Sequence, residues 1–326
     1  MARSLRIEYP GAFYHVMARG NRRGKIFVDD DDRRFFLKAV SEACGMTGWR
    51  VHGWVMMSNH YHFFIETPEA NLVAGMKWLQ NAYTRRFNTR HREWGRLFGD
   101  RYKSVIVEGK DPWYYTTLLD YIHLNPVRAG LVKVSEGQSV LDYPWCSVAS
   151  GYALGPKARA PWLAVGDGLA AFDYQDTAAD RRKFVERLDG RAREERRKDC
   201  GVAEGPEDGR MSNLRSGWYW GKQAFREKLE AMADGVLKVR RNRNYAGASI
   251  QRRHDEKEAE RIVREGLARF GLDRNDLKDL PGSDRRKLEI AAEVRLKTSV
   301  PLGWISDRLG MRSPANVSQQ LRRYQQ

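Results

Sequence analysis

The chain has 326 residues and 41% of them are hydrophobic, so it is long enough for two domains and apolar enough for a packed core. The formal net charge of +16 and the pI near 9.8 favour an anionic partner, most simply nucleic acid, although a basic protein without such a partner would look the same. Cys44, Cys146 and Cys200 are too few and too scattered for a disulfide framework or a zinc site. With no apolar run long enough to span a membrane and no signal-peptide pattern, we expect a cytoplasmic protein with no membrane partner.

The first 150 residues alternate between strand-like and helix-like segments. Alternating apolar residues predict strands at residues 12–18, 50–57, 60–66 and 101–108. Apolar residues at helical spacing predict helices at residues 33–43, 71–88 and 111–124. Acidic residues from Asp29 to Asp32 suit the start of the first helix, and Gly45 and Gly48 are expected to end it. This order predicts an α+β domain.

One predicted strand begins with two histidines separated by a single residue. Side chains at positions i and i+2 of a strand project from the same face, so His60 and His62 can offer two imidazoles to one cation. Tyr121 and Asn125 lie about sixty residues further along, in and just after the helix predicted at residues 111–124. Their spacing of i and i+4 places them on one face of that helix. Two imidazoles and an amide oxygen can hold a divalent ion with open positions, and a phenol beside such an ion can attack a phosphodiester.

Each of these residues also has a simpler structural explanation. His60 and His62 can form the polar face of an exposed edge strand. Tyr121 can be a core tyrosine of an amphipathic helix, and Asn125 can simply cap the end of that helix. Tyr114 shares the face of Tyr121 and is the alternative nucleophile.

Several sequence blocks, in this order, resemble the HUH endonucleases that have one catalytic tyrosine. They are Phe13-Tyr14-His15-Val16 with Arg19-Gly20-Asn21, then Trp54 to His62, then Asp120 to Gly130, and finally Tyr143-Pro144-Trp145-Cys146-Ser147. Within that class the blocks are most similar to the single-strand transposases, and among these to the REP-associated tyrosine transposases. The resemblance covers roughly residues 1–150.

The resemblance implies a ferredoxin-like antiparallel sheet with helices packed on it, and an enzyme that cleaves and rejoins single-stranded DNA. Tyr121 would form a 5′-phosphotyrosine, and His60, His62 and Asn125 would hold Mg²⁺ or Mn²⁺. The implied substrate is a hairpin-forming repeat with a single-stranded segment beside it. The oligomeric state is left open.

Basic and polar residues near these blocks are candidates for contacts with the DNA backbone. They are Arg19, Asn21, Arg22, Arg23, Arg101 and Lys103. Four aromatic residues are candidates for stacking on unpaired bases, namely Trp54, Trp78, Tyr102 and Trp113. A solvated charge run and a set of core aromatics are the simpler explanation of the same residues.

The second half of the chain is more charged and less regular. Residues 217–237 predict a helix, and the basic stretch from Lys238 to Arg253 can be a linker or a DNA-contacting arm. Further helices are predicted at residues 284–297, 302–309 and 313–324.

The last two of these helices are joined at Gly310, and together they resemble a helix-turn-helix such as that of the replication initiator DnaA. The final helix would present Asn316, Gln319, Arg322 and Arg323 to duplex DNA. A helical cap that binds another protein is the alternative.

We therefore predict an HUH domain at residues 1–150, a charged helical and linker region at 151–253, and a helix-turn-helix region at 254–326. A tyrosine transposase is the favoured function. A non-enzymatic helix-turn-helix regulator with a vestigial HUH domain and an HUH replication initiator are the alternatives.

Overall fold

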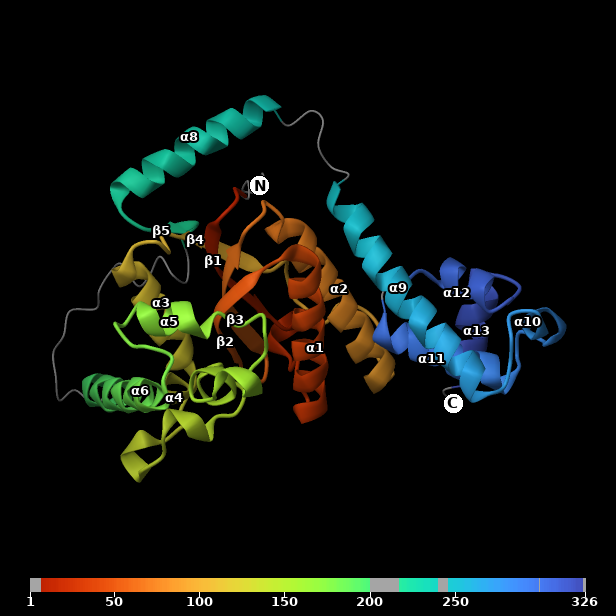
Figure 1. Ribbon diagram of the computed structural model, residues 1–326, viewed down its shortest axis with the longest axis horizontal. Helices are drawn as coiled ribbons and strands as arrows, with labels where there is room; N and C mark the ends of the chain where they lie inside the picture. The colour runs from red at the N-terminus through yellow and green to blue at the C-terminus, as the bar shows by residue number, and fades with distance from the viewer. Residues whose placement is uncertain (1–6, 200–216, 240–245, 299, 325–326) are drawn as a thin grey trace. The chain divides into compact units, whose positions relative to one another are not determined.

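A computed structural model describes residues 7–199, 217–239, 246–298 and 300–324. The chain forms two compact units (Figure 1): the first unit comprises residues 1–76 and 97–242, and the second comprises residues 77–96 and 243–326. The first unit is an α+β domain and the C-terminal region is largely helical, which confirms the predicted fold class. The domain limits at residues 150 and 253 stay predictions.

The first unit is built on a mixed five-stranded sheet in the order β2-β3-β1-β4-β5. Its strands are β1 (Ala12–Arg19), β2 (Arg50–Met56), β3 (His60–Thr67), β4 (Lys103–Val107) and β5 (Tyr219–Trp220). The first four pair in antiparallel fashion, as expected, but β5 pairs with β4 in parallel. The antiparallel sheet expected for residues 1–150 is therefore confirmed for its four strands, and β5, from outside that range, adds a parallel edge strand.

The fifth strand also changes the predicted helix at residues 217–237. The backbone amides of Ile106 and Glu108 donate to the carbonyls of Trp218 (3.1 Å) and Trp220 (2.9 Å). These residues are therefore extended, and the helix α8 (Gln223–Val239) begins only after them. Because the partner strand lies more than 100 residues away, local sequence patterns do not report this pairing.

Helix α1 (Asp30–Thr47) begins and ends where its sequence directs. The Asp29 carboxylate caps its start by accepting from the backbone amide of Asp32 at 3.0 Å. Gly48 ends it with a left-handed φ of 72°, a conformation that costs a glycine little. Gly45, which was also expected to end the helix, lies inside it.

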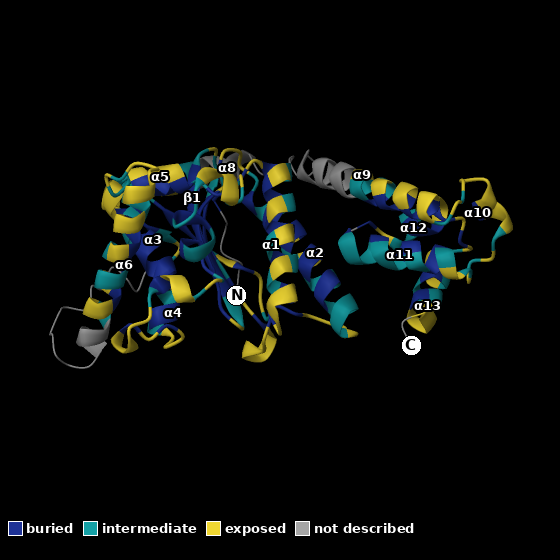
Figure 2. Ribbon diagram, turned by 60° about the horizontal axis from the view of Figure 1, so that its bottom comes forward, coloured by how far each residue is buried: buried dark blue, intermediate teal, exposed yellow. Residues whose placement is uncertain are grey.

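Helices α1 and α3 (Pro112–His123) cover opposite faces of the sheet. On one face the Phe36 ring of α1 packs at 4.9 Å from Tyr61. On the other, the Tyr115 ring of α3 packs at 4.8 Å from Phe64. Figure 2 shows how buried residues run through β1 and α3. The side chains of β3 alternate between these faces, so those of His60 and His62 lie on the α3 side.

Glycine at position 53 lets α3 approach β2 closely. A Cβ atom built there would lie 2.5 Å from Leu119 Cδ1 and 3.5 Å from His123 Nε2. Any side chain at this position would therefore force the Leu119 side chain of α3 to shift.

His123 is buried at the end of α3 and has a consequence for acid stability. Its Nε2 lies 2.8 Å from Ser147 Oγ, and burial, followed by the charge of Arg187, lowers its pKa from 6.5 to about 3. The folded protein therefore holds His123 neutral, whereas the unfolded chain binds a proton below pH 6.5. We expect the free energy of unfolding to fall as pH drops from 6.5 toward 3, by up to about 1.4 kcal/mol per pH unit from this group.

This acid dependence can be measured by chemical denaturation across the pH range. The variant His123→Asn has no group that titrates at this position, so its unfolding free energy should show a shallower pH slope. Equal slopes for the two proteins would contradict the assignment.

Two more helices pack beside the end of α3. They are the short helix α4 (Asn125–Arg128) and the long helix α6 (Ala178–Asp199). A short helix, α5 (Val165–Ala170), lies between them in sequence.

The second unit gathers the C-terminal helices around a core of their own. They are α9 (Ala246–Arg269), α10 (Asp276–Asp279), α11 (Arg285–Lys297), α12 (Leu302–Arg308) and α13 (Pro314–Tyr324). This unit also includes most of α2 (Leu72–His91), whose Arg85 and Arg86 donate to the carbonyls of Val300 (3.3 Å) and Lys297 (2.5 Å). The C-terminal region is thus completed by a helix from the N-terminal half of the sequence.

Part of the predicted basic arm lies outside the described residues, namely Arg240, Arg241 and Arg243. Within the described ranges, the helices are all too short or too polar to cross a lipid bilayer.

Candidate functional site

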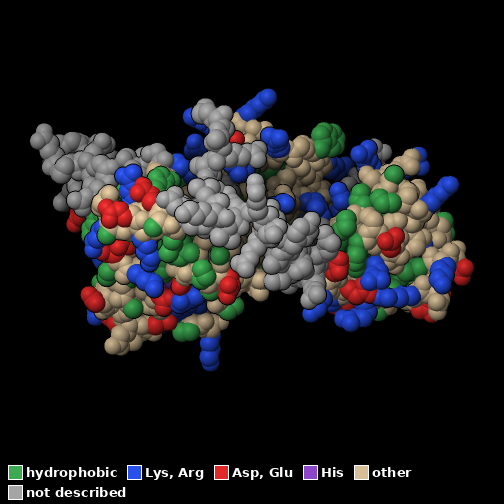
Figure 3. Space-filling model, turned by 90° about the horizontal axis from the view of Figure 1, so that it is seen from above, with side chains coloured by type: hydrophobic (Ala, Val, Ile, Leu, Met, Phe, Trp, Pro, Cys, Tyr) green, Lys and Arg blue, Asp and Glu red, His purple; other side chains and the backbone are tan. Residues whose placement is uncertain are grey.

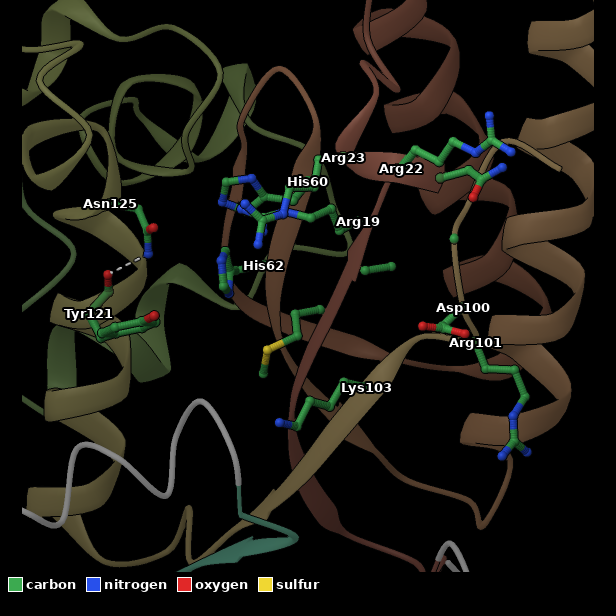
Figure 4. A pocket seen from close by; sticks show the side chains of 15 residues that line it. Arg19, Arg22, Arg23, His60, His62, Asp100, Arg101, Lys103, Tyr121 and Asn125 are labelled. Atoms are coloured by element: carbon green, nitrogen blue, oxygen red, sulfur yellow. Dashed lines mark hydrogen bonds between the residues drawn. The ribbon is translucent and has the colours of Figure 1, made fainter. Parts of the chain in front are cut away.

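A cleft of about 670 Å³ in the first unit contains all four residues of the predicted catalytic group. His60 and His62 lie on one wall, and Tyr121 and Asn125 lie on another (Figure 4). The six predicted DNA-contact residues also line this cleft: Arg19, Asn21, Arg22, Arg23, Arg101 and Lys103. Residues from four separate segments of the sequence are therefore brought to one place.

The register of the sheet explains why basic residues lie next to the histidines. Arg19 of β1 pairs with His60 of β3, and Met17 pairs with His62. On its other side Met17 pairs with Lys103 of β4. Directly paired residues project from the same face, so all five side chains lie on the α3 side of the sheet.

His62 is oriented by a buried third histidine, His15. The Nε2 atom of His15 lies 2.9 Å from Nδ1 of His62, and the rings stack with centroids 5.1 Å apart. For His62 to bind a cation through Nε2, its Nδ1 must carry the proton and donate it to His15. The contact is thus compatible with a metal-binding tautomer of His62.

His60 is oriented by its neighbour Asn59 in the same way. Its Nδ1 lies 2.7 Å from Asn59 Oδ1, while Asn59 Nδ2 donates to the carbonyl of Arg23 at 3.0 Å. If Nδ1 carries the proton and donates the hydrogen bond to Asn59, Nε2 of His60 keeps a lone pair that can bind a metal ion. Burial, and then the nearby charge of Arg19, lower the pKa of His60 from 6.5 to about 4. The imidazole is therefore neutral at neutral pH, which is the form that binds metals.

Tyr121 lies on the last turn of α3 with its ring against both buried histidines. The ring centroid is 5.8 Å from that of His62 and 5.7 Å from that of His15, edge to face in each case. Asn125 Nδ2 donates to the Tyr121 carbonyl at 3.0 Å (Figure 4). Because its nitrogen is used in this bond, Asn125 retains Oδ1 as the oxygen with which it could ligate a cation. The residues present therefore fit a divalent ion.

The rim of the cleft contains a turn with unusual backbone geometry. Arg22 and Arg23, in the short 3₁₀ helix η1 (Asn21–Arg23), have φ angles of 51° and 61°. Such angles are uncommon for residues other than glycine and are maintained here by the surrounding bonds, such as that from Gly24 N to Asn21 O at 2.8 Å. Both arginines are exposed.

Other candidates from the sequence are placed differently. Tyr114 packs edge to face on Trp220 with ring centroids 4.9 Å apart, and it does not line the cleft. Three candidate stacking residues are buried, namely Trp54, Trp78 and Tyr102, which favours the simpler explanation that they are core aromatics. Trp113, by comparison, is 42% exposed.

A second group of potential ligands lies at the other end of β3. His52, Glu66 and Asp167 offer three donor atoms within 4.8 Å of one another. However, Arg50 forms ion pairs with both carboxylates, and Nδ1 of His52 lies 2.7 Å from the Tyr115 hydroxyl. The hydrogen bond from His52 holds the pKa of Glu66 below its usual range. We interpret this group as an ion-pair network, because Arg50 already pairs with both of its carboxylates.

On the face shown in Figure 3, Lys and Arg side chains lie among Asp and Glu side chains. The local excess of Arg and Lys around the cleft is therefore a more specific indication of a polyanion site than the net charge of +16.

The first unit is thus an α+β domain whose cleft combines two histidines, a tyrosine, an amide and a basic rim. Residues 9–125 match the family model described as "Transposase IS200 like". This segment, which contains β1 to β4 and α1 to α3, is similar to IS200-like transposases and agrees with the resemblance at that level.

A solved structure described as a REP-associated tyrosine transposase bound to a REP hairpin is also similar. The sequences are 20% identical, the match covers 49% of this chain and 92% of that one, and the TM-score is 0.38. A search of curated proteins finds no match.

His15 and Arg128 are two residues of the site to which the sequence did not assign a role in catalysis or metal binding. His15 is in a block that carried the resemblance, but its place beside His62 depends on pairing between β1 and β3. Arg128 lies in another such block and contacts Tyr121 after the chain has turned into α4.

Proposed function

We propose that the protein is a metal-dependent single-stranded DNA endonuclease and strand transferase, a transposase of the REP-associated tyrosine type. The observation that carries the proposal is the position of the Tyr121 ring beside His62, in a cleft with a basic rim. The match of residues 9–125 to IS200-like transposases supports it independently. The preferred substrate would be a hairpin-forming repeat with adjoining single-stranded DNA.

The proposed step transfers a phosphoryl group from DNA to Tyr121. The phenolic oxygen attacks the phosphorus, the bond from phosphorus to the 3′-oxygen breaks, and the phenol proton leaves to water. The departing 3′-oxygen takes up a proton, so the products are a 5′-phosphotyrosine and a free 3′-hydroxyl. Because the phosphodiester energy is kept in the covalent bond, attack by another 3′-hydroxyl can rejoin strands without ATP.

The side chains of the cleft have separate roles in this step. His60, His62 and Asn125 would hold Mg²⁺ or Mn²⁺, which when bound would polarise a non-bridging phosphate oxygen. The six residues of the rim would hold the DNA backbone on either side of the scissile phosphate.

The direct test is the formation of a covalent adduct. The protein should be incubated with a labelled single-stranded oligonucleotide and Mg²⁺, then separated on a denaturing gel. We expect a labelled band at the combined mass of protein and DNA fragment. A protein that binds DNA but forms no adduct under these conditions would instead support the non-enzymatic regulator.

The HUH replication initiator remains the alternative enzyme. The same adduct would form in that case, so the substrate separates the two functions. A transposase should join the bound 5′ end to a second DNA molecule, whereas an initiator should use a replication origin.

We further propose that α12 and α13 form a duplex-binding helix-turn-helix. They are joined by a turn in which Gly310 has a φ of 58°, and the Ser306 hydroxyl donates to the Met311 carbonyl at 2.7 Å. Val317 and Leu321 of α13 are buried, whereas Arg322 and Arg323 are exposed. Gln319 is also exposed, and Asn316 is half-buried.

Deleting the C-terminal region would change folding as well as DNA binding, because Arg85 and Arg86 of α2 would lose their bonds to the carbonyls of Val300 and Lys297. We instead expect the double variant Arg322→Ala with Arg323→Ala to weaken binding to duplex or hairpin DNA. If each arginine neutralises one phosphate, the slope of log affinity against log salt should fall by about 2. Fluorescence anisotropy over a salt series measures this slope.

The matched control is Arg261→Ala with Arg269→Ala, which removes the same charge from α9, where these arginines pair with glutamates. The control should keep the original slope. Equal effects of the two double variants would exclude a specific role for α13 and leave protein binding as its alternative.

A further inference from the structure

The turn that carries Tyr121 is tied to helix α6, which lies outside the segment that matches IS200-like transposases. The link is Arg128, whose guanidinium contacts both partners. Its Nε and Nη2 atoms donate to the Glu195 carboxylate of α6 at 2.8 and 2.5 Å. A bidentate pair of this kind fixes the plane of the guanidinium as well as its position.

The same guanidinium contacts Tyr121 in two ways. Its Nη1 atom donates to the Tyr121 carbonyl at 2.9 Å, and its Cζ atom lies 4.9 Å from the centre of the Tyr121 ring. Arg128 therefore contacts both the backbone and the ring face of the proposed nucleophile. Because Arg128 is fixed by Glu195, the position of the ring depends on α6.

A second ion pair joins α6 to the residue before Tyr121. The Asp120 carboxylate is buried and accepts from both Nη atoms of Arg187, at 3.0 and 2.5 Å, with Arg191 at 3.5 Å. A buried carboxylate is strongly destabilising unless it is paired, so this contact is costly to break. Two ion pairs, one on each side of Tyr121, thus bind the turn to α6.

We propose that α6 positions the nucleophile, with Arg128 and Glu195 as positioning residues that orient the Tyr121 ring toward the histidines. This inference rests on the proposed function. In-line attack requires the phenolic oxygen to be placed within a fraction of an ångström, and a misplacement of about 1 Å can reduce the rate by about 100-fold. A helix beyond the matched segment would then belong to the catalytic apparatus.

The first test is Glu195→Gln, which keeps the size of the side chain but removes the charge that fixes Arg128. We expect the rate of adduct formation at saturating DNA to fall roughly 10- to 100-fold. The dissociation constant for DNA should stay within twofold, because Glu195 does not line the cleft.

The matched control is Asp176→Asn, which breaks an ion pair in the same unit between Asp176, Arg159 (2.7 Å) and the α6 residue Arg181 (2.6 Å). In the part of the chain that the structure describes, these ion-paired residues form no hydrogen bond or ion pair with Tyr121. The control should lose a similar amount of thermal stability and keep the adduct rate. Equal rates for wild type and Glu195→Gln, or equal losses in Glu195→Gln and the control, would overturn the proposal.

A charge-swapped double variant, Arg128→Glu with Glu195→Arg, separates positioning from simple attachment of α6. It can restore an ion pair but not the contacts between Arg128 and Tyr121. We expect stability to recover while the adduct rate stays low. Full recovery of the rate would show that only attachment of α6 matters and would overturn the proposal.

A readout that does not need activity distinguishes this inference from the proposed function. With 3-fluorotyrosine at position 121, the fluorine resonance should shift or broaden in Glu195→Gln and remain unchanged in Asp176→Asn. If the wild type forms no adduct, the proposed function fails. The fluorine resonance still tests whether the Arg128–Glu195 pair positions the Tyr121 ring. An unchanged resonance in Glu195→Gln would overturn the link itself.

Discussion

Replacing Tyr121 with phenylalanine is expected to abolish the covalent protein–DNA adduct. The substitution removes only the hydroxyl that would attack the phosphorus, and it keeps the ring that packs against His15 and His62. Folding and DNA binding should therefore be nearly unchanged. Denaturing gels measure the adduct, thermal unfolding measures stability, and fluorescence anisotropy measures binding to a single-stranded oligonucleotide.

Tyr114→Phe is the matched control for this experiment. Tyr114 lies on the same helix and is similarly buried, but its ring packs on Trp113 and Trp220 and does not line the cleft. The control variant should keep full activity. An adduct that persists in Tyr121→Phe and disappears in Tyr114→Phe would transfer the role of nucleophile to Tyr114.

Short-range geometry explains which parts of the site the sequence could predict. His60 and His62 share a strand face because their spacing is two, and the same rule places Tyr61 in the opposite core. The start of α3 at Asp111 and Pro112 follows from capping, which acts within one turn. The fold of residues 1–150 was predictable for the same reason, since four strands and three helices follow clear local patterns.

Other features depend on contacts between distant segments. His15 meets His62 only because β1 and β3 pair in one register, and a shift of one residue would turn its side chain to the other face. The Arg128–Glu195 pair joins residues 67 positions apart. Neither contact leaves a local pattern in the sequence.

The division of the chain into two units also depends on contacts between distant segments, which local sequence patterns do not report. The helix at residues 71–88 was predicted correctly, but its assignment to a core with the C-terminal helices was not foreseen. The apolar stripe of α2 predicts that one face is buried and does not specify which segment buries it. The bonds from Arg85 and Arg86 to the carbonyls of Val300 and Lys297 provide that information.

Alanine at His60 or His62 is expected to reduce adduct formation by more than about 100-fold, because each substitution removes a proposed ligand of the divalent ion. Excess chelator should have the same effect on the wild type, and Mg²⁺ or Mn²⁺ should reverse it. Binding of Mn²⁺, followed by electron paramagnetic resonance, should weaken in both variants even without DNA. His91→Ala, which removes a histidine of the second unit, should leave both measurements unchanged.

The two histidine variants should differ in one respect, which makes the prediction more specific. His62 is 7% exposed and bonded to the buried His15, so His62→Ala leaves a cavity and a buried partner without its bond. His60 is less buried, and its partner Asn59 keeps its bond to Arg23. His62→Ala should therefore also lower the melting temperature, whereas His60→Ala should lose Mn²⁺ binding with little change in stability. Undiminished cleavage in excess chelator, or Mn²⁺ binding in His60→Ala equal to that of the wild type, would show that these histidines serve DNA binding or structure rather than a metal.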